Sequence, residues 1–202
     1  MGRPSKFNRD DAVNTAMEAF WRDGYKASSV KALSEHLGIT RSSFYNAFGS
    51  REDLFREALD RYGEQSPDRA FATAPAATGS VRRLITKTFR AACHARATDL
   101  DAKGCLAVKS VAELCNRDEK LGLMLDEIIQ ANVARLERLL ETGKETGELP
   151  ATLDVHATAL ALKTVLVGLN VICKVIRDEE ELWLSARTAL VALDLFEEDT
   201  AP

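Results

Sequence analysis

One short segment places an arginine, several hydroxyl groups and a tyrosine between apolar anchors. It covers residues 37–48, reads LGITRSSFYNAF, and has Leu37, Ile39 and Phe48 as its anchors. A helix with a purely structural role favours Ala, Glu and Lys at its exposed positions. Small polar groups and one cation instead favour a helix whose exposed face fits closely against another molecule. Arginine donates two hydrogen bonds to guanine or binds a phosphate, and hydroxyl groups suit phosphate oxygens.

The segment contains the end of one short helix and the whole of another, with a glycine between them. We expect a first helix over residues 29–37, ended by Gly38, and a second over residues 40–47, with Thr40 as its N-cap. Two such helices form a helix-turn-helix. In a major groove, the second helix presents the polar residues Arg41, Ser42, Ser43, Tyr45 and Asn46. The alternative is a tight corner between two helices that contacts no DNA.

Further cations flank this pair of helices. Arg51 falls in the first turn of the next helix, where the helix dipole disfavours a cation unless a phosphate lies nearby. Arg3 and Lys6 lie in an N-terminal arm that suits an adjacent groove, or is simply a solvated chain start. Residues 1–50 carry a net charge of +2, whereas the whole chain carries −4. A mildly basic head on an acidic body is typical of a DNA-binding module joined to another domain.

A longer pattern surrounds the helix pair, over residues 19–55. It consists of Gly24-Tyr25, Ser28-Ser29, Gly38, Thr40, Ser42, Tyr45, Phe48, Arg51-Glu52 and Leu54. This combination resembles the DNA-binding head of the TetR family of transcription regulators. The resemblance implies an all-α homodimer of nine helices per chain, in which the head, Ser29 included, binds a palindromic double-stranded DNA operator. It also implies a repressor that an effector releases. Asn46-Ala47 departs from the pattern, because many members have His or Tyr there, and this leaves the sequence preference open.

The rest of the chain reads as long helices. We expect residues 1–62 to form the helix-turn-helix domain, residues 63–79 a linker rich in Ala, Pro and Gly, and residues 80–202 an effector-sensing and dimerisation domain. The last two helices, predicted over 154–177 and 179–197, are too apolar for full exposure. We therefore predict that they form the interface of a homodimer. The alternative is that their apolar faces are buried within one chain.

One cysteine is a candidate sensor. Gly104 is expected to cap a helix, which places Cys105 in the first turn, where the helix N-terminus stabilises a thiolate. Cys115 falls at the opposite end of the same predicted helix. A small buried apolar residue is the alternative role for Cys105. The stretch around Gly104-Cys105-Leu106 also resembles an electrophile-sensing repressor of the TetR family. That resemblance implies that Cys105 senses electrophiles or oxidants and that Lys174 matches a lysine of its penultimate helix.

A polar stripe crosses the apolar helix predicted over residues 154–177. Its members are Lys163, Asn170 and Lys174, spaced by seven and four residues, so they share one helical face. The stripe either lines an effector pocket or is the helix's one solvated edge. A reversible small apolar ligand in the body, with Cys105 inert, is therefore a second hypothesis for the effector.

Other functional classes find little support in the residues. A cysteine-dependent enzyme needs a base beside its thiol, and the three histidines show no such arrangement. The chain has no glycine-rich phosphate loop and no HExxH motif, so we expect no enzyme activity, cofactor or metal. We expect no membrane partner, because no apolar run reaches about 18 residues. The polar N-terminus has no signal-peptide core. The protein is expected in the cytoplasm, with its four cysteines as free thiols.

Overall fold

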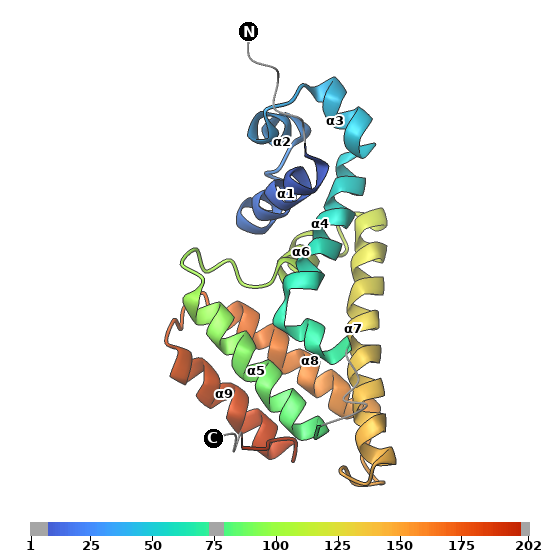
Figure 1. The fold of residues 1–202 in the computed structure, drawn as a ribbon, viewed down its shortest axis with the longest axis vertical. Helices are drawn as coiled ribbons and strands as arrows, with labels where there is room; N and C mark the ends of the chain where they lie inside the picture. The colour runs from blue at the N-terminus through green and yellow to red at the C-terminus, as the bar shows by residue number, and fades with distance from the viewer. Residues whose placement is uncertain (1–7, 73–78, 199–202) are drawn as a thin grey trace. The chain divides into compact units, whose positions relative to one another are not determined.

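The computed structural model describes residues 8–72 and 79–198, and this part of the chain contains helices but no strand (Figure 1). The all-α prediction is therefore confirmed. The elements are α1 (Arg9–Asp23), α2 (Val30–Leu37), α3 (Arg41–Phe48), α4 (Arg51–Gln65), the 3-10 helix η1 (Pro67–Ala72), α5 (Val81–Thr98), α6 (Leu106–Leu114), α7 (Glu119–Glu145), α8 (Val155–Ile172) and α9 (Glu179–Ala192).

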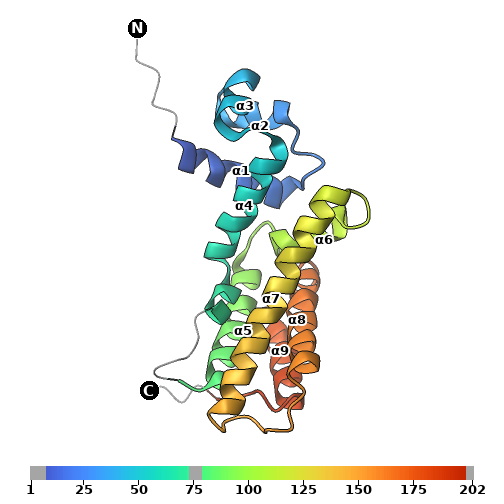
Figure 2. The same cartoon turned by 90° about the vertical axis from the view of Figure 1, so that its right-hand side faces the viewer.

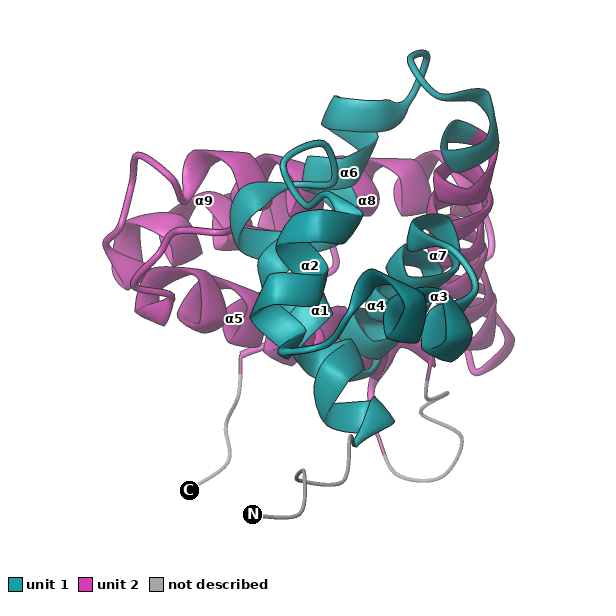
Figure 3. Ribbon diagram, turned by 90° about the horizontal axis from the view of Figure 1, so that it is seen from above, with its two compact units in different colours: residues 1–65, 105–122 teal, residues 66–104, 123–202 magenta. Residues whose placement is uncertain are grey.

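The chain folds as two compact units, which Figure 3 shows in separate colours. Unit 1 contains residues 1–65 and 105–122, and unit 2 contains residues 66–104 and 123–202. Helix α6 thus belongs to the same unit as the first four helices, although the sequence pattern predicts it within the sensing domain. Part of the predicted linker, residues 73–78, lies outside the described residues.

The core of unit 1 is built around aromatic rings from α1 and α4. The ring centroids of Phe20 and Phe55 lie 4.9 Å apart in an edge-to-face arrangement, and the Tyr25 ring lies 4.8 Å from Phe55. Trp21 makes a second edge-to-face contact, 5.0 Å from Tyr62. Such pairs contribute about 0.5–1.5 kcal/mol each beyond the burial of their area. These contacts hold α1 against α4, and α2 and α3 pack against this pair of helices.

The predicted caps set the ends of the short helices. Thr40 Oγ1 accepts a hydrogen bond of 3.1 Å from the Ser43 backbone N–H and so starts α3. Gly38 ends α2 in the left-handed region, at φ +64°, where a residue with a Cβ is strained. Ser50 and Asp53 cap the start of α4, since Ser50 Oγ accepts from the Asp53 N–H at 3.0 Å.

Unit 2 is a bundle in which α5, α8 and α9 run side by side and α7 packs against them (Figures 1 and 2). Each helix contributes fully buried side chains to one core, among them Phe89 of α5, Leu140 of α7, Leu162 of α8 and Leu190 of α9. The interior of unit 2 is thus a single apolar core shared by four helices, and the side chains that remain outside it are available for other contacts.

Helix α8 ends at Ile172, earlier than the predicted end at residue 177. Asp178 then caps α9, accepting a hydrogen bond of 2.9 Å from the Glu181 N–H. Arg177 secures the turn by donating to the backbone carbonyls of Cys173 and Asp99. Lys174 therefore lies in the turn after α8, and the prediction that it shares a helical face with Lys163 and Asn170 is wrong.

The prediction that no apolar run reaches the length needed to cross a membrane is wrong for α8. Over Val155–Ile172 this helix is long and apolar enough to cross a membrane, judged by length and composition alone. Core helices of soluble proteins pass the same test, and only 28% of this stretch is buried inside the protein. Its Leu162 and Leu166 pack in the core of unit 2, whereas Leu160 and Val171 are exposed. The exposed side of α8 is thus the unusual feature, and it bears on assembly.

Candidate nucleic-acid interface and effector site

Helix α3 has one apolar and one polar side. Phe44 and Phe48 are buried in unit 1, with exposed fractions of 0% and 4%. Tyr45, one residue on from Phe44, is 52% exposed. All five residues predicted to face the groove are exposed, namely Arg41, Ser42, Ser43, Tyr45 and Asn46. The helix thus offers a polar face with one cation, and two buried rings anchor the opposite face.

Two further predicted contact residues act as helix caps. Ser29 Oγ accepts a hydrogen bond of 3.2 Å from the Ala32 N–H at the start of α2. Thr40 does the same for α3 and lies 3.0 Å from the Ser43 hydroxyl. Both residues are exposed, so the N-terminal ends of α2 and α3 open to solvent. Helix N-termini attract anions such as phosphate, because their N–H groups and dipole point outward.

Arg51 has a partner that no sequence pattern indicated. Its guanidinium lies 3.9 Å from the centroid of the Tyr25 ring. The Tyr25 hydroxyl donates a 2.7 Å hydrogen bond to Glu52. This bond is the main reason that the pKa of Glu52 is lowered, while burial raises the pKa of Tyr25. The stacked ring holds the Arg51 cation in place at the start of α4. Arg3 and Lys6 lie outside the described residues.

Helix α6 is attached to the end of α1 by two charged side chains. Lys109 Nζ donates to the backbone carbonyls of Trp21 and Arg22, at 2.9 and 2.7 Å. These carbonyls belong to the last turn of α1, where the helix dipole favours a cation. The Glu113 carboxylate accepts from the backbone N–H groups of Tyr25 and Lys26, at 3.0 and 2.8 Å. We call this pair of side chains the α6 clamp.

The α6 clamp also explains why glycine occupies position 24 in the Gly24-Tyr25 pair of the sequence pattern. Gly24 has φ +88°, and a Cβ built on it would lie 2.8 Å from Glu113 Oε2. A side chain at this position would therefore be strained and would push against the carboxylate.

Cys105 is the N-cap of α6 rather than a residue of its first turn. The helix begins at Leu106, and Cys105 has the extended conformation typical of an N-cap, with no side-chain capping hydrogen bond. Its side chain is buried, with 8% exposed. The sulfur thus stands at the N-terminal end of α6, as the thiolate argument requires, but in a confined position.

The other predicted effector residues have separate surroundings. Lys163 lines a small cavity with residues of η1 and α7, including Asp68 and Arg135. Asn170 accepts a 2.5 Å hydrogen bond from the buried Arg96 of α5. A Cβ built on Gly104, which precedes Cys105, would lie 2.5 Å from the Asn170 carbonyl and 3.7 Å from Lys174 Cε. The segment before Cys105 therefore passes close to Asn170 and Lys174, and Lys163 lies apart from this group.

All four cysteines are free thiols. Burial raises the pKa of the Cys93 thiol to about 12 and also raises that of Cys173. Cys173 was not among the predicted sensing residues, although it is buried close to Arg96, Arg177 and Lys174, whose charges oppose this rise. Cys93 and Cys173 are thus poor nucleophiles at neutral pH. Within the described residues, no three His, Cys, Asp or Glu side chains group as metal ligands do.

Comparison with known families assigns the chain. Residues 12–58 match the family of bacterial regulatory proteins named after tetR, and residues 80–189 match the tetracyclin repressor-like C-terminal domain. The chain belongs to the TetR family. It is therefore a DNA-binding transcriptional regulator and not an enzyme.

Similar TetR-family proteins cover almost the whole chain. The uncharacterized HTH-type transcriptional regulator YezE of Bacillus subtilis is 30% identical over 96% of this chain and 100% of its own length. The repressor ComR of Escherichia coli is 28% identical over 94% of this chain and 90% of its own. The E. coli repressor NemR is 24% identical over 86% of this chain and 87% of its own.

Solved structures agree with this assignment. A cysteine mutant of the TetR-family regulator CifR, complexed with 26bp double-strand operator DNA, has a TM-score of 0.82 and 32% identity, covering 95% of this chain and 99% of that chain. The reduced form of E. coli NemR has a TM-score of 0.76 at 21% identity, covering 96% of this chain and 98% of that chain, and supports the fold.

Proposed function

We propose that the protein is a homodimeric repressor that binds a palindromic operator and acts in the cytoplasm. One observation carries the proposal: α3 exposes a run of polar side chains around Arg41 while Phe44 and Phe48 fix its other face in the core. A recognition helix of this kind contacts base edges with its N-terminal residues. CifR, whose chain this protein resembles over nearly its full length, was solved on operator DNA.

Each predicted contact has a chemical role in this proposal. Arg41 donates to guanine or to a phosphate, and Tyr45 and Asn46 extend the same exposed face. The hydroxyl groups of Ser42 and Ser43 reach phosphate oxygens. Thr40 and Ser29 hold the helix N-termini open toward the backbone, where Arg51, positioned by Tyr25, supplies a second cation.

The proposed release mechanism is an electrophile or oxidant that modifies Cys105. Addition to an electrophilic alkene forms a C–S bond and breaks the C=C π bond, and the thiol proton ends on the adjacent carbon. Because Cys105 is 8% exposed, an adduct does not fit without displacing the start of α6. The α6 clamp then carries that displacement to the end of α1. Asn170 and Lys174 lie close to the segment that leads into Cys105, whereas Lys163 lines a separate cavity and has no role in this mechanism.

The second hypothesis is a reversible small apolar ligand in the body, with Cys105 inert. Fluorescence anisotropy on DNA from the protein's own upstream region separates the two. We would titrate wild type, Arg41→Ala and Cys105→Ser, each with and without N-ethylmaleimide. Arg41→Ala is expected to weaken binding by about tenfold or more, since a good base contact contributes about 1–3 kcal/mol. Arg117→Ala removes an exposed cation from the turn after α6 and is the matched control.

Release of wild type by the reagent, with Cys105→Ser still bound, is the expected result for a thiol switch. If both proteins stay bound, the thiol mechanism is wrong and a reversible ligand takes its place. If Arg41→Ala binds as tightly as wild type, α3 does not read the operator as proposed. A steep fall in affinity with salt is expected for every variant that binds DNA.

A further inference from the structure

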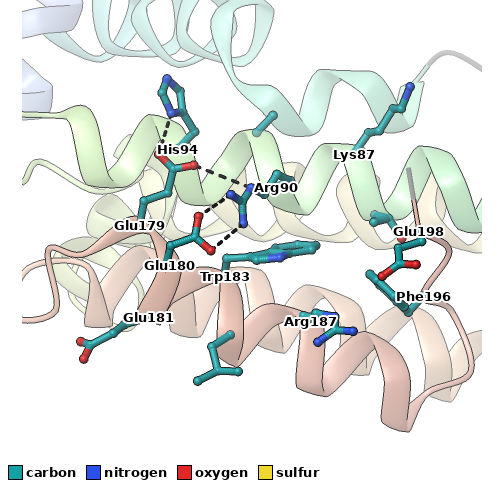
Figure 4. Close-up of a pocket in the computed structure, with 13 residues that line it drawn as sticks. Lys87, Arg90, His94, Glu179, Glu180, Glu181, Trp183, Arg187, Phe196 and Glu198 are labelled. Carbon is teal, nitrogen blue, oxygen red and sulfur yellow. Dashed lines mark hydrogen bonds and ion pairs between the residues drawn. The ribbon is translucent and has the colours of Figure 1, made fainter. Parts of the chain in front are cut away.

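A groove between α5 and α9 has features that the regulator's DNA-binding role does not explain (Figure 4). Its volume is about 1090 Å³, slightly above the range of about 300–1,000 Å³ that small-molecule sites occupy. The lining residues come from both helices and from the segment after α9, so all of them belong to unit 2. The groove is also separate from the segment that leads into Cys105.

One part of the lining is apolar and partly open. The rings of Trp183 and Phe196 lie 6.4 Å apart and are tilted by 51°. Two neighbouring aromatic rings favour a ligand with a flat apolar body, because burying such surface from water is favourable.

The charges at one end of the groove already have partners. Arg90 donates to Glu180 at 2.5 Å, lies 3.7 Å from Glu179 and stacks 5.1 Å from the Trp183 ring. His94 lies 2.8 Å from Glu179. Figure 4 shows these ion pairs together at the His94 end, with Glu181 directed away from them. This cluster closes one end of the groove and leaves Arg90 little capacity for a ligand.

Arg187 differs from Arg90. Its guanidinium lies 5.0 Å from the Phe196 ring, and the side chain is exposed. In the part of the chain that the structure describes, Arg187 has no carboxylate partner. A guanidinium can stack on a ring with its face while its edge donates two N–H groups to an acid. One carboxylate, that of Glu198, also lines this end of the groove (Figure 4).

We propose that the groove binds a mid-sized organic anion, with its flat apolar body against the rings of Trp183 and Phe196 and its acid group on Arg187. Glu198 limits the affinity, because its like charge lies on the same lining. The site needs neither Cys105 nor DNA, so it stands or falls independently of the proposed release mechanism.

The test uses Trp183 as an internal reporter. The chain has two tryptophans, and Trp21→Phe leaves Trp183 as the single donor while keeping an aromatic ring beside Tyr62. The probe is 1-anilinonaphthalene-8-sulfonate, an aromatic sulfonate that accepts energy from tryptophan. Saturable energy transfer from Trp183 reports sulfonate bound on or near unit 2, and the variants below assign that binding to the groove.

Variants and a neutral probe identify the role of charge. Arg187→Gln is expected to weaken the sulfonate by about tenfold, the usual effect of losing a charged hydrogen bond, and Glu198→Gln is expected to tighten it. Arg138→Gln, an exposed arginine of α7 outside the groove, is the matched control and should change nothing. N-phenyl-1-naphthylamine, which lacks the sulfonate, should bind wild type and Arg187→Gln equally.

Three results would overturn the proposal. One is equal sulfonate affinity in wild type and Arg187→Gln, which would mean simple apolar adsorption. Another is weaker sulfonate binding by Glu198→Gln, which would mean that Glu198 supports binding and does not repel the anion as proposed. The third is transfer that appears only when light scattering shows dissociated chains, which would mean that a second copy covers the groove.

Discussion

Tyr25 shows how one side chain organises the DNA-binding head at the residue scale. Its ring packs on Phe55, carries the Arg51 guanidinium at 3.9 Å, and its hydroxyl donates to Glu52. Its backbone N–H also donates to Glu113 of α6. A tyrosine is needed here because only a ring with a hydroxyl group makes the aromatic, cation–π and hydrogen-bonding contacts together.

The Tyr25–Glu52 hydrogen bond predicts a pH-dependent stability. The pKa of Glu52 is lowered in the folded protein, mainly by this bond. The ionised carboxylate therefore stabilises the folded state fully at pH values above the unfolded carboxyl pKa of about 4.3. The contribution is lost as pH falls through the lowered folded pKa. Glu52→Gln is expected to cost about 1 kcal/mol at neutral pH, a value reduced for the partial exposure of Glu52, and progressively less as the pH falls below the unfolded pKa of the carboxyl.

Urea unfolding followed by circular dichroism, repeated across this pH range, measures the difference. Tyr25→Phe removes the same bond from the other side, so the double variant should be little less stable than either single variant. If the curves of wild type and Glu52→Gln stay parallel down to acid pH, the bond does not stabilise the ionised carboxylate.

At the scale of elements, the α6 clamp makes a helix from the middle of the chain part of the head. We predict that Glu113→Ala speeds hydrogen exchange at the Tyr25 and Lys26 amides by about tenfold or more, since both lose a charged acceptor. Exchange detected residue by residue by NMR is the measurement. Glu119→Ala, which removes an exposed carboxylate at the start of α7, should leave both amides protected.

Glu113→Gln refines this result, because the amide keeps one acceptor oxygen and should restore protection at one of the two amides. Unchanged exchange in Glu113→Ala would mean that Glu113 does not hold α6 to the head in solution.

Local signals account for the elements that the sequence predicts well. Thr40 and Gly38 act within a few residues of themselves, so these helix starts and stops follow directly from their types. The α6 clamp could not be predicted in this way. Lys109 and Glu113 meet partners 87 or 88 residues earlier in the chain, and no periodicity links them. The turn after α8 was missed for the same reason, because Arg177 binds the Asp99 carbonyl from another helix.

The whole molecule leaves one side of α8 and α9 exposed and apolar. Leu160 and Val171 of α8 are 44% and 56% exposed, and Leu184 and Val191 of α9 are 62% and 54% exposed. On each helix the two residues fall on nearly the same face. Burying such faces in a second copy removes apolar surface from water, which is how stable homodimer interfaces gain most of their free energy.

The proposed dimer gives the last prediction. Val191→Glu places a charge on the apolar face of α9 that the proposed interface buries, where desolvation without a partner is costly. Light scattering should therefore show a single chain for Val191→Glu and two chains for wild type. Leu123→Glu, at a residue of α7 that is 61% exposed, is the matched control and should stay dimeric. Operator affinity should fall when dimerisation is lost, because two linked heads on adjacent half-sites bind about 10²–10⁴ times more tightly than one. A dimeric Val191→Glu would place the interface elsewhere, and a monomer that keeps full operator affinity would separate DNA recognition from assembly.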